Sequence, residues 1–139
     1  MRTVYVDTGA FLAAIRKRDR DHVRVGEHFA RLQRERAQLI TVEPVIAETA
    51  TRLRYDADVR AVLTFRQVLD DAVSVGALRV REGDPRLRQA AFELMARFDA
   101  LPLSFADCVG AVVAQEVRAD AVFGLDSDFT IMGFALEPA

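Results

Sequence analysis

The sequence predicts an α/β fold, in the form of a three-layer α/β/α domain with a small central parallel sheet. Short runs rich in β-branched residues alternate with longer segments whose apolar residues recur at helical spacing. This alternation is typical of parallel strands joined by helices that cover both faces of the sheet. The 139 residues, 51% of them hydrophobic, suit one adequate core, so we expect a single domain over residues 1–139.

The first half of the chain contains two strand candidates and three helices. Residues 2–6 form a β-branched run, and residues 38–42 form the second candidate. Between them a short helix stops in a charged cluster, and Asp21 is the expected N-cap of the next helix. Pro44, near a first helical position, opens the helix that follows the second strand.

The second half begins with a long amphipathic segment that ends at Gly76 and leads into a strand at residues 77–81. Asp84 is expected to cap the next helix, and Pro85 opens it. After a linker, Ser104 starts a helix that continues to about residue 118. The last two strand candidates are residues 121–125 and 134–136.

Composition excludes several classes of protein. The net charge of -2 does not by itself demand a nucleic-acid partner. Lys17 is the only lysine among 19 basic residues; arginine suits phosphate, but a G+C-rich genome explains the bias more simply. The single Cys108 excludes an internal disulfide and a cysteine zinc site, and we interpret it as a small buried hydrophobe. His22 and His28 are expected as capping or surface groups.

No apolar run approaches the roughly 20 residues that span a bilayer. The N-terminus shows no signal-peptide pattern. We therefore expect a cytoplasmic protein with no membrane partner.

Four acidic residues, Asp7, Glu48, Asp107 and Asp126, lie where apolar segments meet turns or helix starts. In an open α/β sheet, the carboxyl ends of the strands and the adjoining helix starts converge on one crevice. Four carboxylates in one crevice repel one another unless something cationic lies between them. A hard divalent cation is the natural occupant, and phosphate chemistry is its commonest use.

Each acid also has a structural explanation. Asp7 follows a strand and suits a helix cap, while Ser104 and Asp107 match a capping box. A glutamate on a helix usually faces solvent, and two acids spaced like Asp126 and Asp128 are common in turns. The set of four acids is stronger grounds for a site than any member alone.

The order and surroundings of these acids resemble the PIN domain family. Successive acids are 41, 59 and 19 residues apart (7 to 48, 48 to 107 and 107 to 126), which suits that family. The matching motifs are Val4-Tyr5-Val6-Asp7-Thr8-Gly9-Ala10-Phe11-Leu12, Val45-Ile46-Ala47-Glu48, Leu103-Ser104-Phe105-Ala106-Asp107 and Phe123-Gly124-Leu125-Asp126-Ser127-Asp128-Phe129. One departure concerns the fourth motif, which more often carries Thr or Ser in the segment where this chain has only apolar residues and Gly124.

Within the family, the compact single-domain form most resembles the VapC toxins of bacterial toxin–antitoxin modules. The resemblance implies a Mg²⁺- or Mn²⁺-dependent endoribonuclease that a small antitoxin holds in check. The residues it marks as catalytic and metal-binding are Asp7, Glu48, Asp107 and Asp126, with Asp128 as an auxiliary acid and Thr8 and Ser104 as supporting hydroxyls. We expect the three aspartates of the quartet to hold metal most directly, and Glu48 to act through water.

The RNA backbone must be neutralised outside the acidic pocket. Arg52 and Arg54 lie about one turn beyond Glu48, and Arg16 and Arg18 belong to a second basic cluster. These four are the candidate RNA-binding residues, although solvated helix faces and termini are the better explanation of any single one.

The resemblance also implies a homodimer paired through helices and an antitoxin segment bound along an apolar groove. Apolar helix residues permit such a groove, and a plain core explains the same residues, namely Phe11, Leu12, Phe29 and Leu32.

Two alternatives stay open. A catalytically silent PIN-like module that binds RNA or protein is one, and it would be expected to lack at least one of the acids. Another metal-dependent phosphoryl hydrolase, with Asp7 as nucleophile, is the other. That second class usually has an acid two residues later, where this chain has Gly9, and a lysine for the phosphoryl group, for which only Lys17 exists.

Overall fold

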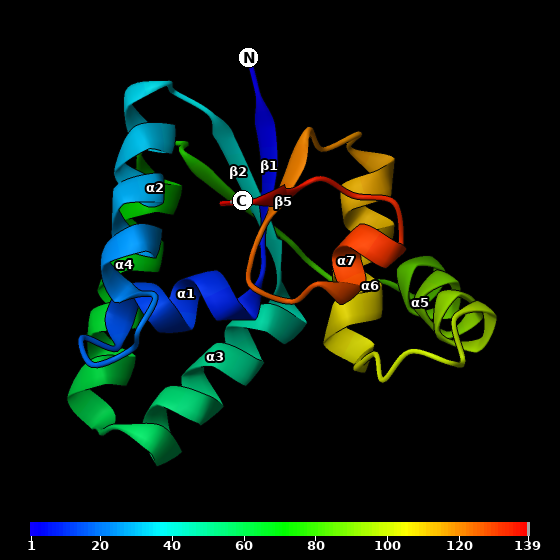
Figure 1. Ribbon diagram of the computed structural model, residues 1–139, viewed down its shortest axis with the longest axis horizontal. Coiled ribbons are helices and arrows are strands. Elements are labelled where there is room, and N and C mark those ends of the chain that lie inside the picture. Colours follow the sequence, from blue (N-terminus) through cyan, green and yellow to red (C-terminus); the bar gives the residue numbers. More distant parts are fainter. Residues whose placement is uncertain (139) are drawn as a thin grey trace.

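The computed structural model describes residues 1–138 and contains a five-stranded parallel sheet between helical layers (Figure 1). The spatial order of the strands is β3-β2-β1-β4-β5. They are β1 (Thr3–Val6), β2 (Gln38–Val42), β3 (Leu78–Arg81), β4 (Ala121–Phe123) and β5 (Leu136–Glu137), and every neighbouring pair is parallel. The predicted α/β class and parallel sheet are confirmed. Residue 139 of the predicted single domain lies outside the described residues, and the single-domain organisation stays a prediction.

Seven helices connect the strands of the described chain. They are α1 (Thr8–Ile15), α2 (His22–Arg34), α3 (Glu43–Asp56), α4 (Val59–Ser74), α5 (Pro85–Arg97), α6 (Phe105–Glu116) and α7 (Asp128–Ile131). Figure 1 shows α1 to α4 on one side of the sheet and α5 to α7 on the other. None of the helices in this part of the chain has both the length and the apolar character that crossing a bilayer requires.

The winding of the chain creates a switch point between β1 and β4. From β1 the chain moves outward to β2 and β3, and then returns through α5 and α6 to β4 on the other side of β1. Right-handed crossovers require the helices to change face when the direction of winding reverses. In folds of this kind, ligands bind outside the carboxyl ends of the strands at the switch point.

Local signals explain most helix starts. The Asp84 side chain accepts a hydrogen bond from the Leu87 N–H, and Ser104 forms the predicted capping box at the start of α6. Asp21 occupies the N-cap position of α2, but the prediction that it caps this helix is wrong. Its backbone is not in the extended conformation that capping needs, and its carboxylate accepts from Arg24 instead.

The last two strands differ from the prediction. β4 ends at Phe123 rather than at residue 125, and β5 begins at Leu136 rather than at residue 134. The four-residue helix α7 between them is too short for a periodic pattern to reveal. A turn at Gly133, with φ of 99°, ties the Phe134 N–H to the carbonyl of Phe129 and delays the final strand.

The core explains most of the apolar helix residues. Phe11, Leu12 and Leu32 are buried in it, and Phe29 is half-buried against Phe123. Cys108 is fully buried, as predicted. These residues stabilise the domain through packing, which confirms the plain-core explanation.

Helix α6 lies tightly against β1 at Gly110. A Cβ atom at Gly110 would lie 2.0 Å from the hydroxyl oxygen of Tyr5 and 2.5 Å from the adjoining ring carbon. Real Cβ contacts are never this short, so a side chain at position 110 would displace the helix or the tyrosine. The absence of a side chain at Gly110 is therefore required for this spacing of α6 and β1.

We expect Gly110→Ala to lower the free energy of unfolding by about 1–3 kcal/mol through overpacking. Gly26→Ala is the matched control, because Gly26 is exposed in the middle of α2 and its Cβ would meet nothing within 4 Å. That substitution should raise stability by about 0.5–1 kcal/mol, since alanine favours the helix. Urea unfolding of the two variants measures both effects, and equal behaviour would contradict the packing described.

Candidate functional site

Asp7 lies at the switch point between β1 and β4. It directly follows β1, and its N–H donates to the carbonyl of Phe123 at 2.9 Å. Gly124 follows Phe123 and packs against Asp7 so closely that a Cβ at Gly124 would lie 3.1 Å from the Asp7 Cβ. The glycine in the fourth motif thus allows the end of β4 to approach Asp7. Asp126 follows two residues later.

The Asp7 side chain does not cap α1, so the capping explanation for it is wrong. The residue is only 4% exposed, and its Oδ1 has no hydrogen-bond partner among the described residues. Burial, followed by the charge of Asp107, raises the pKa of Asp7 from 3.8 to about 7. The charges of Glu48 and Asp126 add to the rise, while a hydrogen bond from the Thr8 backbone opposes it. The four predicted acids are therefore coupled electrostatically around Asp7.

Asp107 is both a helix cap and a member of this acidic group. Its Oδ2 accepts from the Ser104 N–H at 2.9 Å, and the Ser104 hydroxyl accepts from the Asp107 N–H at 3.0 Å. Burial raises the pKa of Asp107, hydrogen bonding to its carboxylate from the Ser104 backbone and side chain lowers it, and the charges of Asp126 and Asp128 raise it. The capping box is confirmed, and it holds the carboxylate in place by one oxygen.

Glu48 lies on α3 and is half-buried, in contrast to a fully solvated helix face. The buried Thr8 hydroxyl donates to Glu48 Oε2 at 3.3 Å. The structure thus brings Thr8 and Glu48 together, while the supporting role of this hydroxyl in a reaction stays a prediction.

Asp126 is held by the backbone of the turn that follows it. Its Oδ1 accepts from the Asp128 N–H at 2.9 Å. Asp128 begins α7, and its charge acts on Asp107, which puts the predicted auxiliary acid within the electrostatic reach of the site.

The carboxylates are the oxygen ligands that a divalent cation prefers, although their oxygens do not converge on a common point in this structure. Among residues 1–138, no three His, Cys, Asp or Glu side chains stand close enough together to hold a metal ion as they are. Asp7 Oδ1 is nonetheless buried without a donor, in a field of like charges that a cation would offset. Glu48, Asp107 and Asp126 are each fixed by a hydrogen bond to one oxygen, so rotation of the side chains can present the other.

Sequence reasoning missed Tyr5. Its hydroxyl is fully buried and has no hydrogen-bond partner among the described residues. Burial raises the pKa of Tyr5 well above its ordinary value, and the charges of Asp7, Asp107 and Glu48 add to the effect. The available signal was the strand period of two, which puts Tyr5 and Asp7 on the same face of β1.

The predicted RNA-binding arginines differ in their surroundings. Arg16 is half-buried and donates to Asp56 at 3.0 Å and to Asp19 at 3.2 Å. The other three arginines are exposed and form no ion pair within residues 1–138; they are Arg18, Arg52 and Arg54. Their contact with RNA stays a prediction.

The two histidines serve the fold in different ways. His22 Nδ1 lies 2.7 Å from the carbonyl of Ala13 in the last turn of α1, which confirms a capping role. His28 is not a surface group, so that interpretation is wrong. Its side chain is 10% exposed, lies 3.1 Å from Glu137 Oε2, and packs edge-on against Phe123.

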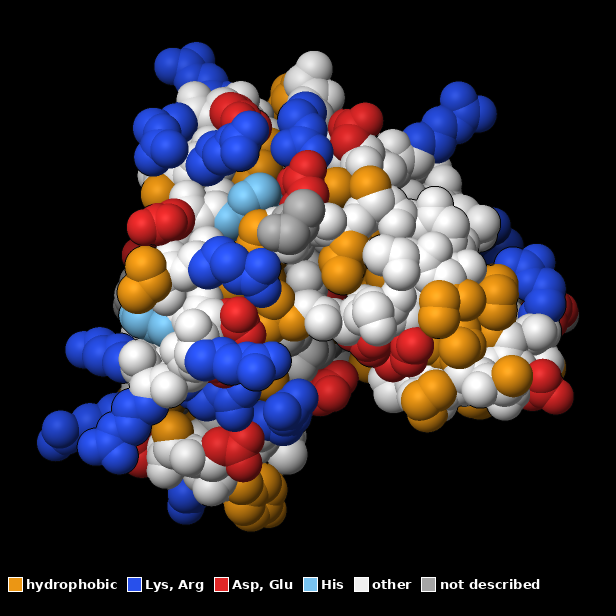
Figure 2. All heavy atoms as spheres, in the orientation of Figure 1, with side chains coloured by type: hydrophobic (Ala, Val, Ile, Leu, Met, Phe, Trp, Pro, Cys, Tyr) orange, Lys and Arg blue, Asp and Glu red, His pale blue; other side chains and the backbone are white. Residues whose placement is uncertain are grey.

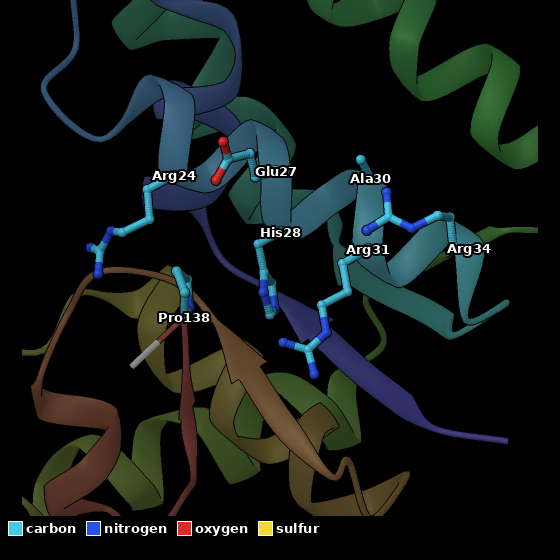
Figure 3. Close-up of a pocket in the computed structure, with 7 residues that line it drawn as sticks. All are labelled: Arg24, Glu27, His28, Ala30, Arg31, Arg34 and Pro138. Atoms are coloured by element: carbon cyan, nitrogen blue, oxygen red, sulfur yellow. The ribbon is translucent and has the colours of Figure 1, made fainter.

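A basic hollow of about 430 Å³ lies along α2 and contains none of the four acids (Figure 3). It is lined by Arg24, Glu27, His28, Ala30, Arg31, Arg34 and Pro138. Figure 2 shows Lys and Arg side chains gathered over this side of the molecule. Two of the lining arginines pair with carboxylates of their own helix region, Arg24 with Asp21 and Arg31 with Glu35.

The fold and the site define a doubly wound α/β domain with an acidic cluster at its switch point. The chain belongs to the PIN domain family, because the sequence model of that family matches residues 4–135. The predicted family is confirmed. No curated protein sequence shows a match to the chain.

Solved structures agree with the family. VapC20 of Mycobacterium tuberculosis, described as a Sarcin-Ricin loop cleaving toxin, is 25% identical with a TM-score of 0.80, over 95% of this chain and 96% of its own. VapBC2 of Rickettsia felis, bound to a DNA fragment from its promoter, is 14% identical with a TM-score of 0.68, over 97% of each chain. PAE2754 of Pyrobaculum aerophilum is 16% identical with a TM-score of 0.66, over 97% of this chain and 83% of its own. The similarities to VapBC2 and PAE2754 concern the fold alone. The similarity to VapC20 confirms the predicted resemblance to VapC toxins.

We expect Asp7→Asn to stabilise the metal-free protein at neutral pH. Because the pKa of Asp7 is raised in the folded state, the native protein binds a proton more tightly than the unfolded chain. Stability is therefore lost as pH rises from about 4 to about 7, by an amount on the order of 4 kcal/mol, and Asn at this position removes the loss.

Urea unfolding in chelator across pH 4 to 8 measures the difference between Asp7→Asn and the unsubstituted protein. The control is Asp70→Asn, which changes an exposed aspartate on α4 and should leave the pH profile unaltered. Parallel profiles for Asp7→Asn and the unsubstituted protein would show that the buried carboxylate carries no such penalty.

Proposed function

We propose that the chain is a metal-dependent endoribonuclease, acting as a single PIN domain and serving as the toxin of a type II toxin–antitoxin module. The observation that carries this proposal is Asp7, a buried carboxylate whose pKa is raised beside three other acids at the switch point of a PIN fold. The similarity to VapC20, described as a toxin that cleaves the Sarcin-Ricin loop, supports RNA as the substrate class.

Asp7, Asp107 and Asp126 would hold Mg²⁺ or Mn²⁺ most directly. When bound, a divalent cation offsets the carboxylate charge that repels phosphate and makes a water molecule more acidic. Glu48 orients that water for attack on phosphorus, and the Thr8 hydroxyl holds the glutamate in position. Ser104 does the same for Asp107 through the capping box. Hydrolysis forms a bond from the water oxygen to phosphorus and breaks the bond to the leaving sugar oxygen.

Arginines near the site would neutralise the RNA backbone. Arg52 lies one helical turn after Glu48 on α3, and Arg54 follows on the same helix. Both side chains are exposed and are free of ion pairs to other described residues, as is Arg18, whereas Arg16 already binds two carboxylates. Arg18, Arg52 and Arg54 are therefore stronger candidates for phosphate contact than Arg16.

A toxin that cleaves cellular RNA needs a protein that holds it in check, so the proposal includes an antitoxin. It also includes a homodimer, which the resemblance to VapC toxins implies. Exposed apolar side chains extend from the end of α3 along α4, where Tyr55 is 82% exposed and Val59 and Leu63 are about half exposed. Such side chains suit a helical partner. Light scattering on the purified chain, with and without a co-expressed antitoxin, tests both partners.

Purified protein incubated with total RNA should yield discrete fragments when Mg²⁺ or Mn²⁺ is present and none in chelator. Asp107→Asn should slow cleavage about a hundredfold or more, because it weakens the binding of the cation that stabilises charge in the transition state. An oligonucleotide with the Sarcin-Ricin loop sequence provides a defined substrate beside total RNA.

Asp99→Asn is the matched control, since Asp99 is an exposed aspartate in the linker before α6. It should cleave like the unsubstituted protein. Retained RNA binding without cleavage at any metal concentration would overturn the enzyme and support the silent RNA-binding module.

In the Asp107→Asn background, Arg52→Gln should weaken RNA binding several-fold. The loss of one phosphate contact should also reduce the slope of log affinity against log salt by about 1. Arg60→Gln, at an exposed position of α4, is the control and should leave both quantities unchanged. Fluorescence anisotropy between 50 and 200 mM salt, about the range over which such contacts are screened, measures them.

A further inference from the structure

We propose that Tyr5 is a positioning residue of the acidic site. Its single phenol O–H is the hydrogen-bond donor that holds one carboxylate of the site, that of Asp7 or Asp107, in place when the acids bind a divalent cation. The proposal rests on the metal site of the proposed function, and it assigns a role to a residue that has none in the chemistry described so far.

Strand β1 and helix α6 together place the Tyr5 hydroxyl near Asp7 and Asp107. Tyr5 and Asp7 are two residues apart on one extended segment, so their side chains point to the same face of the sheet. On α6, Gly110 follows Asp107 by three residues, so the two share one helix face. The Tyr5 hydroxyl oxygen lies 2.0 Å from the position of a Cβ at Gly110, which sets it one turn along α6 from Asp107.

The hydroxyl is placed where the surrounding protein offers it no acceptor. Tyr5 is fully buried, and its oxygen has no partner among the described residues. An unpaired buried hydroxyl costs stability, and a phenylalanine would fill nearly the same volume without that cost. Gly110 makes room for the hydroxyl, so two residues together produce an arrangement that packing alone does not require.

The complementary group is also unpartnered. Within residues 1–138, Asp7 Oδ1 is a buried acceptor without a donor, and the Tyr5 hydroxyl two residues away is a buried donor without an acceptor. Burial first, and then the charges of Asp7, Asp107 and Glu48, raise the pKa of the Tyr5 hydroxyl, so all three acids act on this group. In this proposal, rotation of Asp7 or Asp107 toward a cation brings a carboxylate oxygen to the phenol. Hydrogen bonds of this kind orient metal ligands, and their loss typically lowers metal affinity about 10- to 100-fold.

The test is Mn²⁺ binding to Tyr5→Phe, measured by calorimetry and by the electron paramagnetic resonance of free Mn²⁺, with no RNA present. We expect Tyr5→Phe to bind Mn²⁺ about tenfold more weakly or worse than the unsubstituted protein. Its melting temperature without metal should be equal to or above that of the unsubstituted protein. Ser74→Ala is the control, because it removes a hydroxyl from an exposed residue at the end of α4, a helix that contributes none of the four acids. It should change neither quantity.

Equal Mn²⁺ affinity in Tyr5→Phe and the unsubstituted protein would overturn the proposal. So would a fall in the metal-free melting temperature of Tyr5→Phe, since the hydroxyl would then serve the fold. Failure of the unsubstituted protein to bind Mn²⁺ would refute the metal site and this role together. Normal Mn²⁺ binding without RNA cleavage would refute the ribonuclease while leaving the role of Tyr5 intact.

Discussion

The burial of one carboxylate among three others is the constraint on which the rest of the site depends. Asp7 is almost fully buried, and its pKa is raised first by that burial and then by Asp107. Like charges in a poorly solvated crevice separate or take up protons unless the fold holds them together. Here the fold does so by three separate hydrogen bonds, from the Ser104 N–H, the Thr8 hydroxyl and the Asp128 N–H, each to one oxygen of a neighbouring acid. These hydrogen bonds hold the three neighbouring acids in position.

Close approach of the backbone makes this arrangement possible. Gly124 lets the end of β4 come against Asp7, and Gly110 lets α6 come against Tyr5. The parallel register of β1 and β4, with Val6 beside Phe123, then carries Asp126 to the same edge of the sheet. The position of the site follows from the reversal of winding at this pair of strands, and its compactness follows from the two glycines.

Much of the fold could be predicted because its signals are local. The limits of β2, the Asp84 cap of α5, the capping box of α6 and the prolines at helix starts involve residues within a few positions of one another. The errors concern partners distant in sequence. His28 was interpreted as a surface group because its contacts, Glu137 at 109 positions away and Phe123, lie far along the chain. The sequence also identified the four acids, but not the unpaired state of Asp7, and Tyr5 was missed because a tyrosine in a strand is ordinarily a core residue.

The fourth motif departs from the pattern that the resemblance to the PIN family implies. That pattern predicts a Thr or Ser hydroxyl in the segment before Asp126, where this chain has glycine and apolar residues. The acid is instead held by the N–H of Asp128 at the start of α7, a donor that every residue but proline supplies. Gly124 in this segment has no side chain, which allows its close contact with Asp7. A support that depends on a backbone turn leaves the side chains of the segment free to pack, so the missing hydroxyl is consistent with an intact acidic site.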